Sequence, residues 1–397
     1  MIFIKRKDNF STKLIHAKEP EKKPENALNN PIFMTSTFTF DSLEDAEAAF
    51  EFETDDYVYT RGNNPTLKIL EEKMADLESG AGAVAFASGM GAISAALLSL
   101  LKPGDKILAH QILYGSSYKF IKQWLQDYNI EGNFIDFNDL EQLNQAIDKK
   151  TEVLYLETPA NPTLEVIDLE KIARVARENN CKLVVDNTFA SPYLQNPLEH
   201  GANIVIHSAT KYLGGHGDLV GGIVIADSKD YIMNLKFNYL TELGSVMSPF
   251  NAWLILRGLK TLKLRMEAAQ ANAIAIVEFL QAQNQIKSVN YPGLKSEKTE
   301  KIVKKQMVGP GAMLSFELNE DVTKIRKFVN NLEYFKLAVS LGDIESLIEY
   351  PFFMTHRDYS EEMLNRLGIN KYLLRISVGL EDSNVLIEDL NSNLQKL

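Results

Sequence analysis

The sequence predicts an α/β protein, in which a mainly parallel sheet with helices on both faces is followed by a smaller α+β domain. In most of the chain before residue 249, short apolar runs alternate with helical patterns, which is typical of parallel sheets covered by helices. After residue 249 a long helical pattern leads to a few separate apolar runs. The composition, with 45% hydrophobic and 24% charged residues, is that of an ordinary globular protein.

The first sixty residues are expected to form an arm and not a domain of their own. Residues 19–30 are charged and interrupted by proline, and residues 31–40 are rich in Thr and Phe. Residues 41–52 have the pattern of a short helix. This mixture offers no apolar face large enough for a separate core.

From residue 64 the pattern becomes regular and predicts the sheet strand by strand. Helical patterns cover residues 67–77 and 89–101. The expected strands share a short apolar run, and they are residues 83–86, 106–109, 132–136, 153–157, 183–186, 204–207 and 222–226. The helices expected between several of these strands are residues 118–128, 140–149 and 169–179.

The last third of the chain has a different pattern. Residues 252–281 read as one long helical stretch, and the apolar runs 312–317, 335–340 and 373–378 read as strands. We therefore expect residues 61–256 to form a ligand-binding α/β domain and residues 257–397 to form an α+β domain.

Charge and cysteine content exclude several classes of protein. The 42 basic and 53 acidic residues give a formal charge of −11, the wrong sign for a surface that binds nucleic acid. The single cysteine, Cys181, excludes an internal disulfide and fits a reducing compartment such as the cytoplasm. The longest apolar stretch, residues 81–101, is interrupted by Ser and Gly, so we expect neither a membrane span nor a signal peptide. The six histidines show no metal-binding spacing, so no metal site is expected.

A lysine at the end of one expected strand has an unusual setting. Lys211 follows the run 204–207 in IVIHSATKYLGGHGD, and ligands of open α/β sheets collect at the carboxyl ends of strands. Partial removal from water would lower the pKa of this amine and make it nucleophilic. The alternative is a loop lysine whose stem is packed and whose head lies in water.

Two further stretches carry possible chemistry. Asp186 ends the apolar run in LVVDN, where a carboxylate would face a cationic ring nitrogen or serve as a turn residue. The stretch SGMG at 88–91 precedes a helical pattern, and free N–H groups at a helix start attract anions. The alternative is a small-residue helix start chosen for packing. It matches neither GxGxxG nor a P-loop, which counts against dinucleotides and ATP.

Arg375 places a charge inside the apolar strand pattern LLRISV. A buried guanidinium needs an anion, and a bidentate substrate carboxylate satisfies it best. The alternatives are an arginine that faces solvent or one that pairs with an internal Asp or Glu. An amine, a carboxylate, an anion-binding helix start and a carboxylate-binding arginine are together what a pyridoxal-phosphate enzyme acting on an amino acid needs.

Several stretches are similar to those of one known family: HSATKYLGGHGD, VVDNTFASPYLQNPLEHGA, ETPANPT, YTRGNNPT, ASGMGAIS, LYG and RISVGLED. From about residue 31 to residue 390 the chain resembles the Cys/Met-metabolism enzymes that depend on pyridoxal 5'-phosphate (PLP), the trans-sulfuration family, with methionine γ-lyases and cystathionine γ-lyases closest. The resemblance implies a type I, aspartate aminotransferase-like fold. It also implies a homotetramer built from active dimers, with residues 1–60 contacting a neighbouring subunit.

The resemblance implies roles for individual residues. Lys211 would bond to the cofactor and take the Cα proton, and Tyr114 would stack on the cofactor ring and act as an acid or base. Ser340 and Arg375 would bind the substrate carboxylate. The residues implied to hold the cofactor, the first two for a neighbouring subunit, are Tyr59, Arg61, Gly89, Met90, Tyr114, Asn161, Asp186, Ser208, Thr210 and Lys211.

The expected reaction is γ-elimination of L-methionine or a related sulfur amino acid to 2-oxobutyrate, ammonia and a thiol. Val58 favours a short thioether, because cystathionine enzymes commonly carry an acidic residue there. Ser116 stands where methionine γ-lyases usually have cysteine, and Glu349 either matches a distal-pocket position of cystathionine γ-lyases or is a surface carboxylate. The alternatives are a cystathionine γ- or β-lyase, a γ-replacement enzyme (cystathionine γ-synthase or O-acetylhomoserine sulfhydrylase), and an inactive scaffold with this fold.

Overall fold

The computed structural model describes residues 9–294, 296–357 and 359–397. Within these ranges the larger unit is built on a seven-stranded sheet in the order β1-β7-β6-β5-β4-β2-β3. Its strands are β1 Gly82–Phe86, β2 Lys106–His110, β3 Glu131–Ile135, β4 Thr151–Glu157, β5 Lys182–Asp186, β6 Ile204–Ser208 and β7 Gly222–Ala226. Only β7 runs antiparallel to its neighbours, which confirms the mainly parallel sheet.

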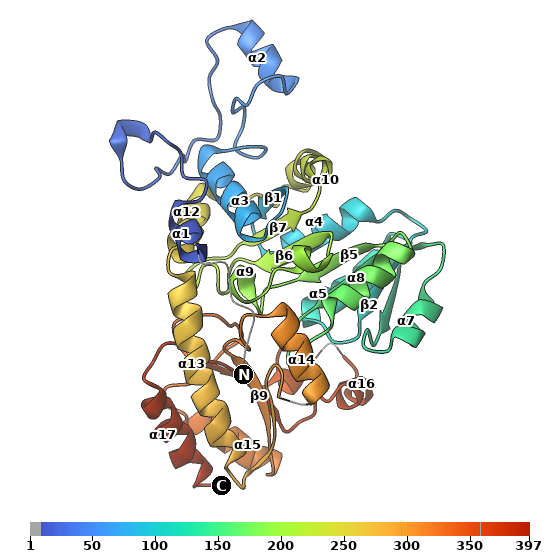
Figure 1. Ribbon diagram of the computed structural model, residues 1–397, viewed down its shortest axis with the longest axis vertical. Helices are drawn as coiled ribbons and strands as arrows, with labels where there is room; N and C mark the ends of the chain where they lie inside the picture. The colour runs from blue at the N-terminus through green and yellow to red at the C-terminus, as the bar shows by residue number, and fades with distance from the viewer. Residues whose placement is uncertain (1–8, 295, 358) are drawn as a thin grey trace.

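Helices cover both faces of this sheet (Figure 1). Side chains alternate along a strand, so Val205 of β6 packs in the cluster beneath α3 (Pro65–Leu77) and α12 (Pro249–Leu259). Its neighbours Ile204 and Ile206 pack in the cluster beneath α4 (Gly89–Leu100). A strand buried on both faces reads as a continuous apolar run, which is why these strands were predictable.

Apart from α13, the remaining helical segments are at most 12 residues long, and those labelled η are 3-10 or π turns. They are α1 Phe10–His16, η1 Pro24–Asn26, α2 Leu43–Phe50, α5 Gly115–Lys119, η2 Phe120–Trp124, α6 Leu125–Asp127, α7 Leu140–Ala146, α8 Leu169–Glu178, α9 Ser191–Leu194, η3 Pro197–His200, α10 Lys229–Asn234, η4 Leu235–Leu240, α11 Thr241–Leu243, α13 Leu262–Gln281, α14 Glu297–Gln306, α15 Val322–Asn331, η5 Pro351–Phe353, α16 Glu361–Arg366 and α17 Ser383–Leu394. Among the described residues, no helix is both long and apolar enough to cross a membrane.

A second, smaller sheet confirms the α+β character of the C-terminal region. Its order is β10-β11-β12-β9-β8, and only the β10–β11 pair is parallel. The strands are β8 Ile286–Asn290, β9 Met313–Leu318, β10 Lys336–Leu337, β11 Leu347–Glu349 and β12 Leu373–Ser377. The exact domain boundaries at 60/61 and 256/257 stay a prediction.

The helical stretch predicted over residues 252–281 is two helices, because α12 ends at Leu259 and α13 begins at Leu262. Side chains take over the backbone bonding at the break. The Gly258 carbonyl accepts from Arg265 Nη2 at 2.8 Å and from Thr261 Oγ1 at 3.2 Å. Side chains that bond to backbone carbonyls in this way interrupt the regular helical ladder.

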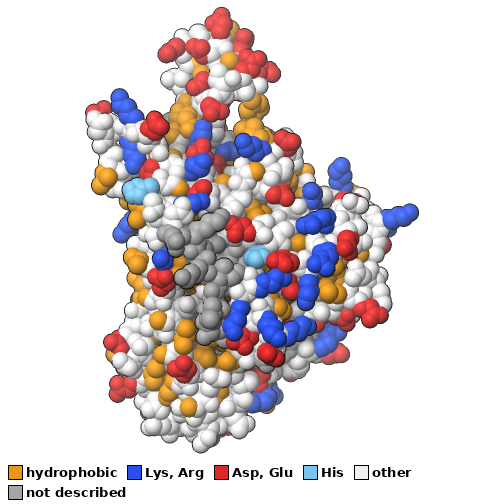
Figure 2. All heavy atoms as spheres, in the orientation of Figure 1, with side chains coloured by type: hydrophobic (Ala, Val, Ile, Leu, Met, Phe, Trp, Pro, Cys, Tyr) orange, Lys and Arg blue, Asp and Glu red, His pale blue; other side chains and the backbone are white. Residues whose placement is uncertain are grey.

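The first sixty residues include an arm that stands away from both sheets. In Figure 1 the segment that carries α2 projects from the top of the molecule, and Figure 2 shows acidic side chains gathered on its tip. An isolated bridge between Thr37 and Tyr59 holds the two stems of the arm together.

Candidate active site

A pocket of about 510 Å³ lies at the carboxyl ends of the parallel strands. It is lined there by the last residue of three strands, Glu157 of β4, Asp186 of β5 and Ser208 of β6. Of the residues predicted for the site, the pocket brings together Gly89, Met90, Tyr114, Asn161, Asp186, Ser208, Thr210, Lys211, Ser340 and Arg375. These residues come from both sheets and from the loops between them.

Lys211 lies three residues beyond the end of β6 and points into this pocket rather than into solvent. Its Nζ donates to Ser340 Oγ at 2.8 Å. Burial, with a smaller contribution from the nearby Arg375 charge, lowers the pKa of Lys211 from 10.5 to about 8. An amine in this condition is a nucleophile and a proton acceptor near neutral pH.

The start of α4 forms an anion-binding wall of the pocket. Ser88 caps the helix by accepting from the Gly91 N–H at 3.0 Å. The N–H groups of Gly89 and Met90 belong to the first turn, where helix geometry provides no intrahelical acceptor. A Cβ on Gly89 would lie 2.9 Å from the Ser208 Cβ, so only glycine lets the helix start approach the end of β6. This cradle suits a phosphate group.

Two carboxylates stand side by side at the ends of β4 and β5, because Glu157 is in register with Asp186. Burial raises the pKa of Asp186, and hydrogen bonds from Thr188, including its N–H at 2.9 Å from Oδ1, act in the opposite direction. Glu157 also has a raised pKa through burial, and its two oxygens accept from the Tyr114 N–H at 2.9 and 3.0 Å. A buried carboxylate such as Asp186 is stabilised in its charged form by a cationic partner, as a protonated ring nitrogen would be.

Arg375 is 3% exposed on β12 and has several polar partners. Its Nη1 donates to Asn161 Oδ1 at 2.8 Å, its Nη2 donates to the Ser340 carbonyl at 2.8 Å, and Nη2 also contacts a carboxylate oxygen of Glu349. Glu349 faces Arg375 across the β11–β12 pair and is 1% exposed. The prediction of Glu349 as a surface carboxylate is therefore wrong. Arg375 pairs with an internal glutamate, which was one of the alternatives for this arginine.

Ser340 carries backbone strain at the centre of this arrangement. Its φ is 145°, a region that residues other than glycine rarely adopt and that costs about 1–3 kcal/mol. The strand predicted over 335–340 is correspondingly shorter, and β10 ends at Leu337. In this backbone conformation Ser340 accepts two hydrogen bonds at once, one from Lys211 at its hydroxyl and one from Arg375 at its carbonyl.

The pocket residues absent from the sequence-based prediction of the site include Glu157 and Phe189, whose ring centroid lies 6.0 Å from Arg375 Cζ. Glu349 was placed near the pocket only through the family resemblance, with a surface position as the alternative. Glu157 closes an apolar run in the same way as Asp186, so the signal was available for that residue. The burial of Glu349 depends on strand pairing and leaves no such local signal.

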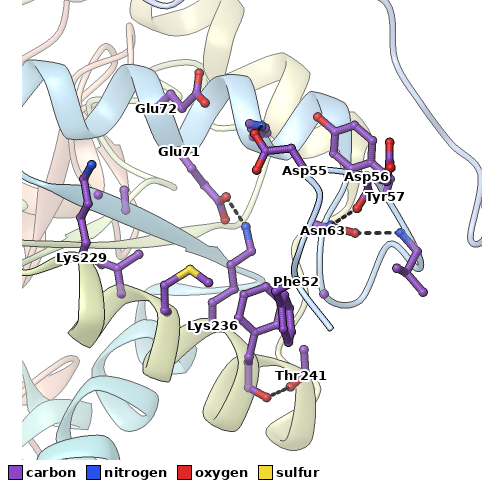
Figure 3. Close-up of a pocket in the computed structure, with 18 of the residues that line it drawn as sticks. Phe52, Asp55, Asp56, Tyr57, Asn63, Glu71, Glu72, Lys229, Lys236 and Thr241 are labelled. Carbon is purple, nitrogen blue, oxygen red and sulfur yellow. Dashed lines mark hydrogen bonds and ion pairs between the residues drawn. The ribbon is translucent and has the colours of Figure 1, made fainter. Parts of the chain in front are cut away.

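Tyr59 and Arg61 do not reach the Lys211 pocket within one chain. They line a separate groove of about 800 Å³ between the arm and the main body. Figure 3 shows Glu71 of α3 and Lys236 of η4 pointing toward each other in this groove, with Nζ and Oε2 2.6 Å apart. Arg61 Cζ lies 5.7 Å from the Tyr59 ring centroid.

The pocket residues fit the cofactor implied by the sequence. A primary amine of lowered pKa, a helix start with free donors and a buried carboxylate line the same cavity. These are the groups that the aldehyde, the phosphate and the ring nitrogen of PLP require. Among the described residues, no group of three or more His, Cys, Asp or Glu side chains could hold a metal ion.

Comparisons with known proteins agree with this geometry. A family model described as Cys/Met metabolism PLP-dependent enzyme matches residues 11–395. An L-methionine gamma-lyase of Fusobacterium nucleatum subsp. polymorphum is 44% identical over 394 residues, which are 99% of each chain. A cystathionine beta-lyase of Lactococcus lactis subsp. cremoris is 42% identical over 98% of this chain and 99% of the relative.

A solved structure gives the same result for the fold. Cystathionine gamma synthase from Xanthomonas oryzae pv. oryzae superposes with a TM-score of 0.93 at 37% identity, covering 98% of this chain and 99% of that structure. The predicted resemblance and the predicted fold are confirmed.

Proposed function

The chain belongs to the family of Cys/Met metabolism PLP-dependent enzymes, and from this premise we propose that it catalyses γ-elimination of L-methionine or a related sulfur amino acid. It is a PLP-dependent carbon–sulfur lyase. The products would be 2-oxobutyrate, ammonia and a thiol. The observation that carries the proposal is the lining of one pocket by Lys211 and Arg375, an amine of lowered pKa and a buried guanidinium.

In this proposal each group of residues has one task. The N–H groups of Gly89 and Met90, with the hydroxyls of Ser208 and Thr210, hold the phosphate. Asp186 holds the ring nitrogen in its protonated form, and Asn161 lies beside the ring. When bound, PLP supplies an aldehyde for the substrate amine and a cationic ring that accepts electron density from the substrate carbons.

Proton transfers are the task of Lys211 and Tyr114. The Lys211 amine, with a pKa of about 8, changes protonation near neutral pH and takes the Cα proton. Tyr114 is held at the pocket by its N–H bond to Glu157 and donates a proton to the leaving sulfur. Arg375 and Ser340 orient the substrate by its carboxylate.

The methionine branch is favoured over the cystathionine branch by the apolar Val339 in the pocket lining and by Val58 next to Tyr59. The cystathionine beta-lyase similarity keeps β-elimination of cystathionine as the second candidate. Ser116, in place of the cysteine usual in methionine γ-lyases, favours that candidate.

We also propose that the protein works as a homotetramer of active dimers in the cytoplasm. Large hydrophobic side chains of the arm are exposed in the single chain, and exposed apolar patches of this kind mark protein–protein contacts. They are Leu28 at 88%, Met34 at 65%, Leu43 at 70%, Phe50 at 66% and Phe52 at 59%. A neighbouring subunit that covers them would also receive Tyr59 and Arg61 at its phosphate.

Product analysis tests the proposal. The holoenzyme is incubated separately with methionine, cystathionine, homocysteine, and O-acetylhomoserine plus sulfide, and 2-oxobutyrate, pyruvate, ammonia and thiols are quantified. We expect 2-oxobutyrate and methanethiol from methionine, and none from the Lys211→Ala variant. Pyruvate from cystathionine, with no 2-oxobutyrate from methionine, would assign the chain to the second candidate.

A further inference from the structure

The carboxylate-binding arginine of the pocket already has a carboxylate against it. Arg375 Nη2 donates to the Ser340 carbonyl and contacts Glu349, while Nη1 donates to Asn161. Arg375 and Glu349 are both at least 97% buried, so water screens their interaction little. Both line the same cavity as Lys211.

The geometry of a guanidinium limits where a second carboxylate can bind. Its two bidentate edges are Nη1 with Nη2 and Nε with Nη2, so both edges include Nη2. A substrate carboxylate on either edge therefore meets the Glu349 carboxylate or replaces it. Arg375 Nε is buried and has no hydrogen-bond partner among the described residues, so on the edge formed by Nε and Nη2 the Nε donor is available for a ligand.

Glu349 also has a second anchor that is independent of Arg375. Its Oε1 accepts from the Thr355 hydroxyl, and Thr355 Oγ1 lies 2.9 Å from His356 Nδ1. His356 Nε2 lies 3.1 Å from the Asn161 carbonyl oxygen, which ties this loop to the pocket wall. The bond from Thr355 to Oε1 can therefore remain when Oε2 loses its contact with Arg375 Nη2.

We propose that Glu349 is an internal competitor for Arg375, which a substrate carboxylate must displace from Nη2 in order to bind. This inference rests on the proposed function, in which Arg375 receives the substrate carboxylate. Glu349 then weakens binding of every carboxylate ligand. Its charge also raises the pKa of Lys211, as the charge of Asp343 does, so the two effects have to be separated by a control. It acts as a positioning residue that sets affinity.

The test uses a carboxylate ligand that cannot react. The probe is 4-(methylsulfanyl)butanoate, which has the methionine skeleton without the amine, and its dissociation constant for the holoenzyme is measured by calorimetry. In Glu349→Gln, which keeps the size and one acceptor oxygen, we expect the probe to bind about tenfold more tightly, the effect of removing one charged competitor. In turnover the same variant should lower KM by a similar factor, whereas Asp343→Asn, which also removes a charge that raises the pKa of Lys211, should leave KM within about twofold of wild type.

A matched control separates competition from general electrostatics. Asp343 is a partly exposed carboxylate that lines no part of the pocket but acts on Lys211 through its charge. Asp343→Asn should leave probe affinity within about twofold of wild type. Equal tightening in Asp343→Asn and Glu349→Gln would overturn the proposal, and so would unchanged or weaker binding in Glu349→Gln.

Two further variants keep the outcome decisive. If Glu349→Gln does not fold, Glu349→Asp carries the test, because its shorter side chain should tighten probe binding by a smaller factor, and no tightening contradicts the proposal. Arg375→Gln tests the proposed function itself. If Arg375→Gln leaves probe affinity unaltered, the substrate-carboxylate role of Arg375 fails and the inference fails with it. If Arg375→Gln abolishes binding but Glu349 variants do not tighten it, only the inference fails.

Discussion

At the residue scale, the lowered pKa of Lys211 has a direct kinetic consequence. The pKa is about 8 because burial and the Arg375 charge disfavour the ammonium form, so the neutral amine predominates only above that pH. Capture of the cofactor needs the neutral amine. We predict that the rate at which the apoprotein takes up PLP rises with pH and levels off above about 8, followed by the absorbance of the bound cofactor.

The Asp343→Asn variant supplies the matched comparison for this prediction. The Asp343 charge raises the pKa of Lys211, so its removal should move the midpoint of the pH profile to lower pH. A midpoint near the 10.5 of a free lysine in the wild-type protein would contradict the buried position of the amine.

The same scale shows what local sequence can and cannot reveal. Asp186 ends an apolar run, Arg375 interrupts one and Lys211 follows one closely, so these three residues could be singled out from a few neighbouring residues. The partner of Arg375 was not, because Glu349 meets it only through the pairing of β11 with β12. Without the strand register, a buried glutamate and a surface glutamate read alike.

At the element scale, prediction succeeded where a strand is buried on both faces. The strands β4, β5 and β6 contain the uninterrupted apolar runs VLYL, LVV and IVI, so their ends were located to within two residues. β8, with the sequence IKSVN, is half-buried and carries polar residues, and β11 is three residues long. Neither has a hydrophobic pattern long enough to distinguish it from a loop.

A buried ion pair that fastens α1 to α3 gives a prediction at this scale. Lys73 of α3 is fully buried, and its Nζ donates to Glu19 Oε1 at 3.0 Å and to the carbonyls of Leu14 and Ile15 near the end of α1. Burial opposes ionisation of Glu19, but hydrogen bonds from Lys23 and Lys73 outweigh it and lower its pKa from 4.5 to about 2.

We predict that Glu19→Gln lowers the free energy of unfolding by about 2 kcal/mol at neutral pH, because it leaves a buried ammonium without its anion. A depressed carboxyl pKa stabilises the fold above 4.5, and this contribution disappears as the pH falls toward 2. The stability difference between wild type and variant, measured by denaturant unfolding, should therefore shrink over that range. The control is Glu21→Gln, whose side chain is exposed, and a pH-independent difference for Glu19→Gln would count against the ion pair.

At the scale of the whole molecule, the order of the sheet explains how distant motifs form one site. β1, β2, β4, β5 and β6 all point the same way, so the residues that follow them meet at one edge. The second sheet then adds Arg375 from β12, and the loop between β10 and β11 adds Ser340. Parallel order was predictable from the alternation of runs. The placement of the arm was not, because large apolar side chains of the arm such as Leu28, Leu43 and Phe50 stay exposed in the single chain.

The separation of Arg61 from the Lys211 pocket leads to the last prediction, which concerns sites shared between subunits. Arg61→Ala and Lys211→Ala should each be inactive at limiting PLP, the first through weak phosphate binding. If the arm of one chain completes the pocket of its partner, a dimer with one chain of each kind contains one intact site. Co-expression in equal amounts makes about half of the dimers mixed, so about a quarter of wild-type activity should return.

The pair Asp186→Ala with Lys211→Ala is the control, because both residues line the pocket of one chain and no mixed dimer has an intact site. Equal recovery in the two pairs, or none in either, would mean that each chain completes its own pocket or that Arg61 has no part in it.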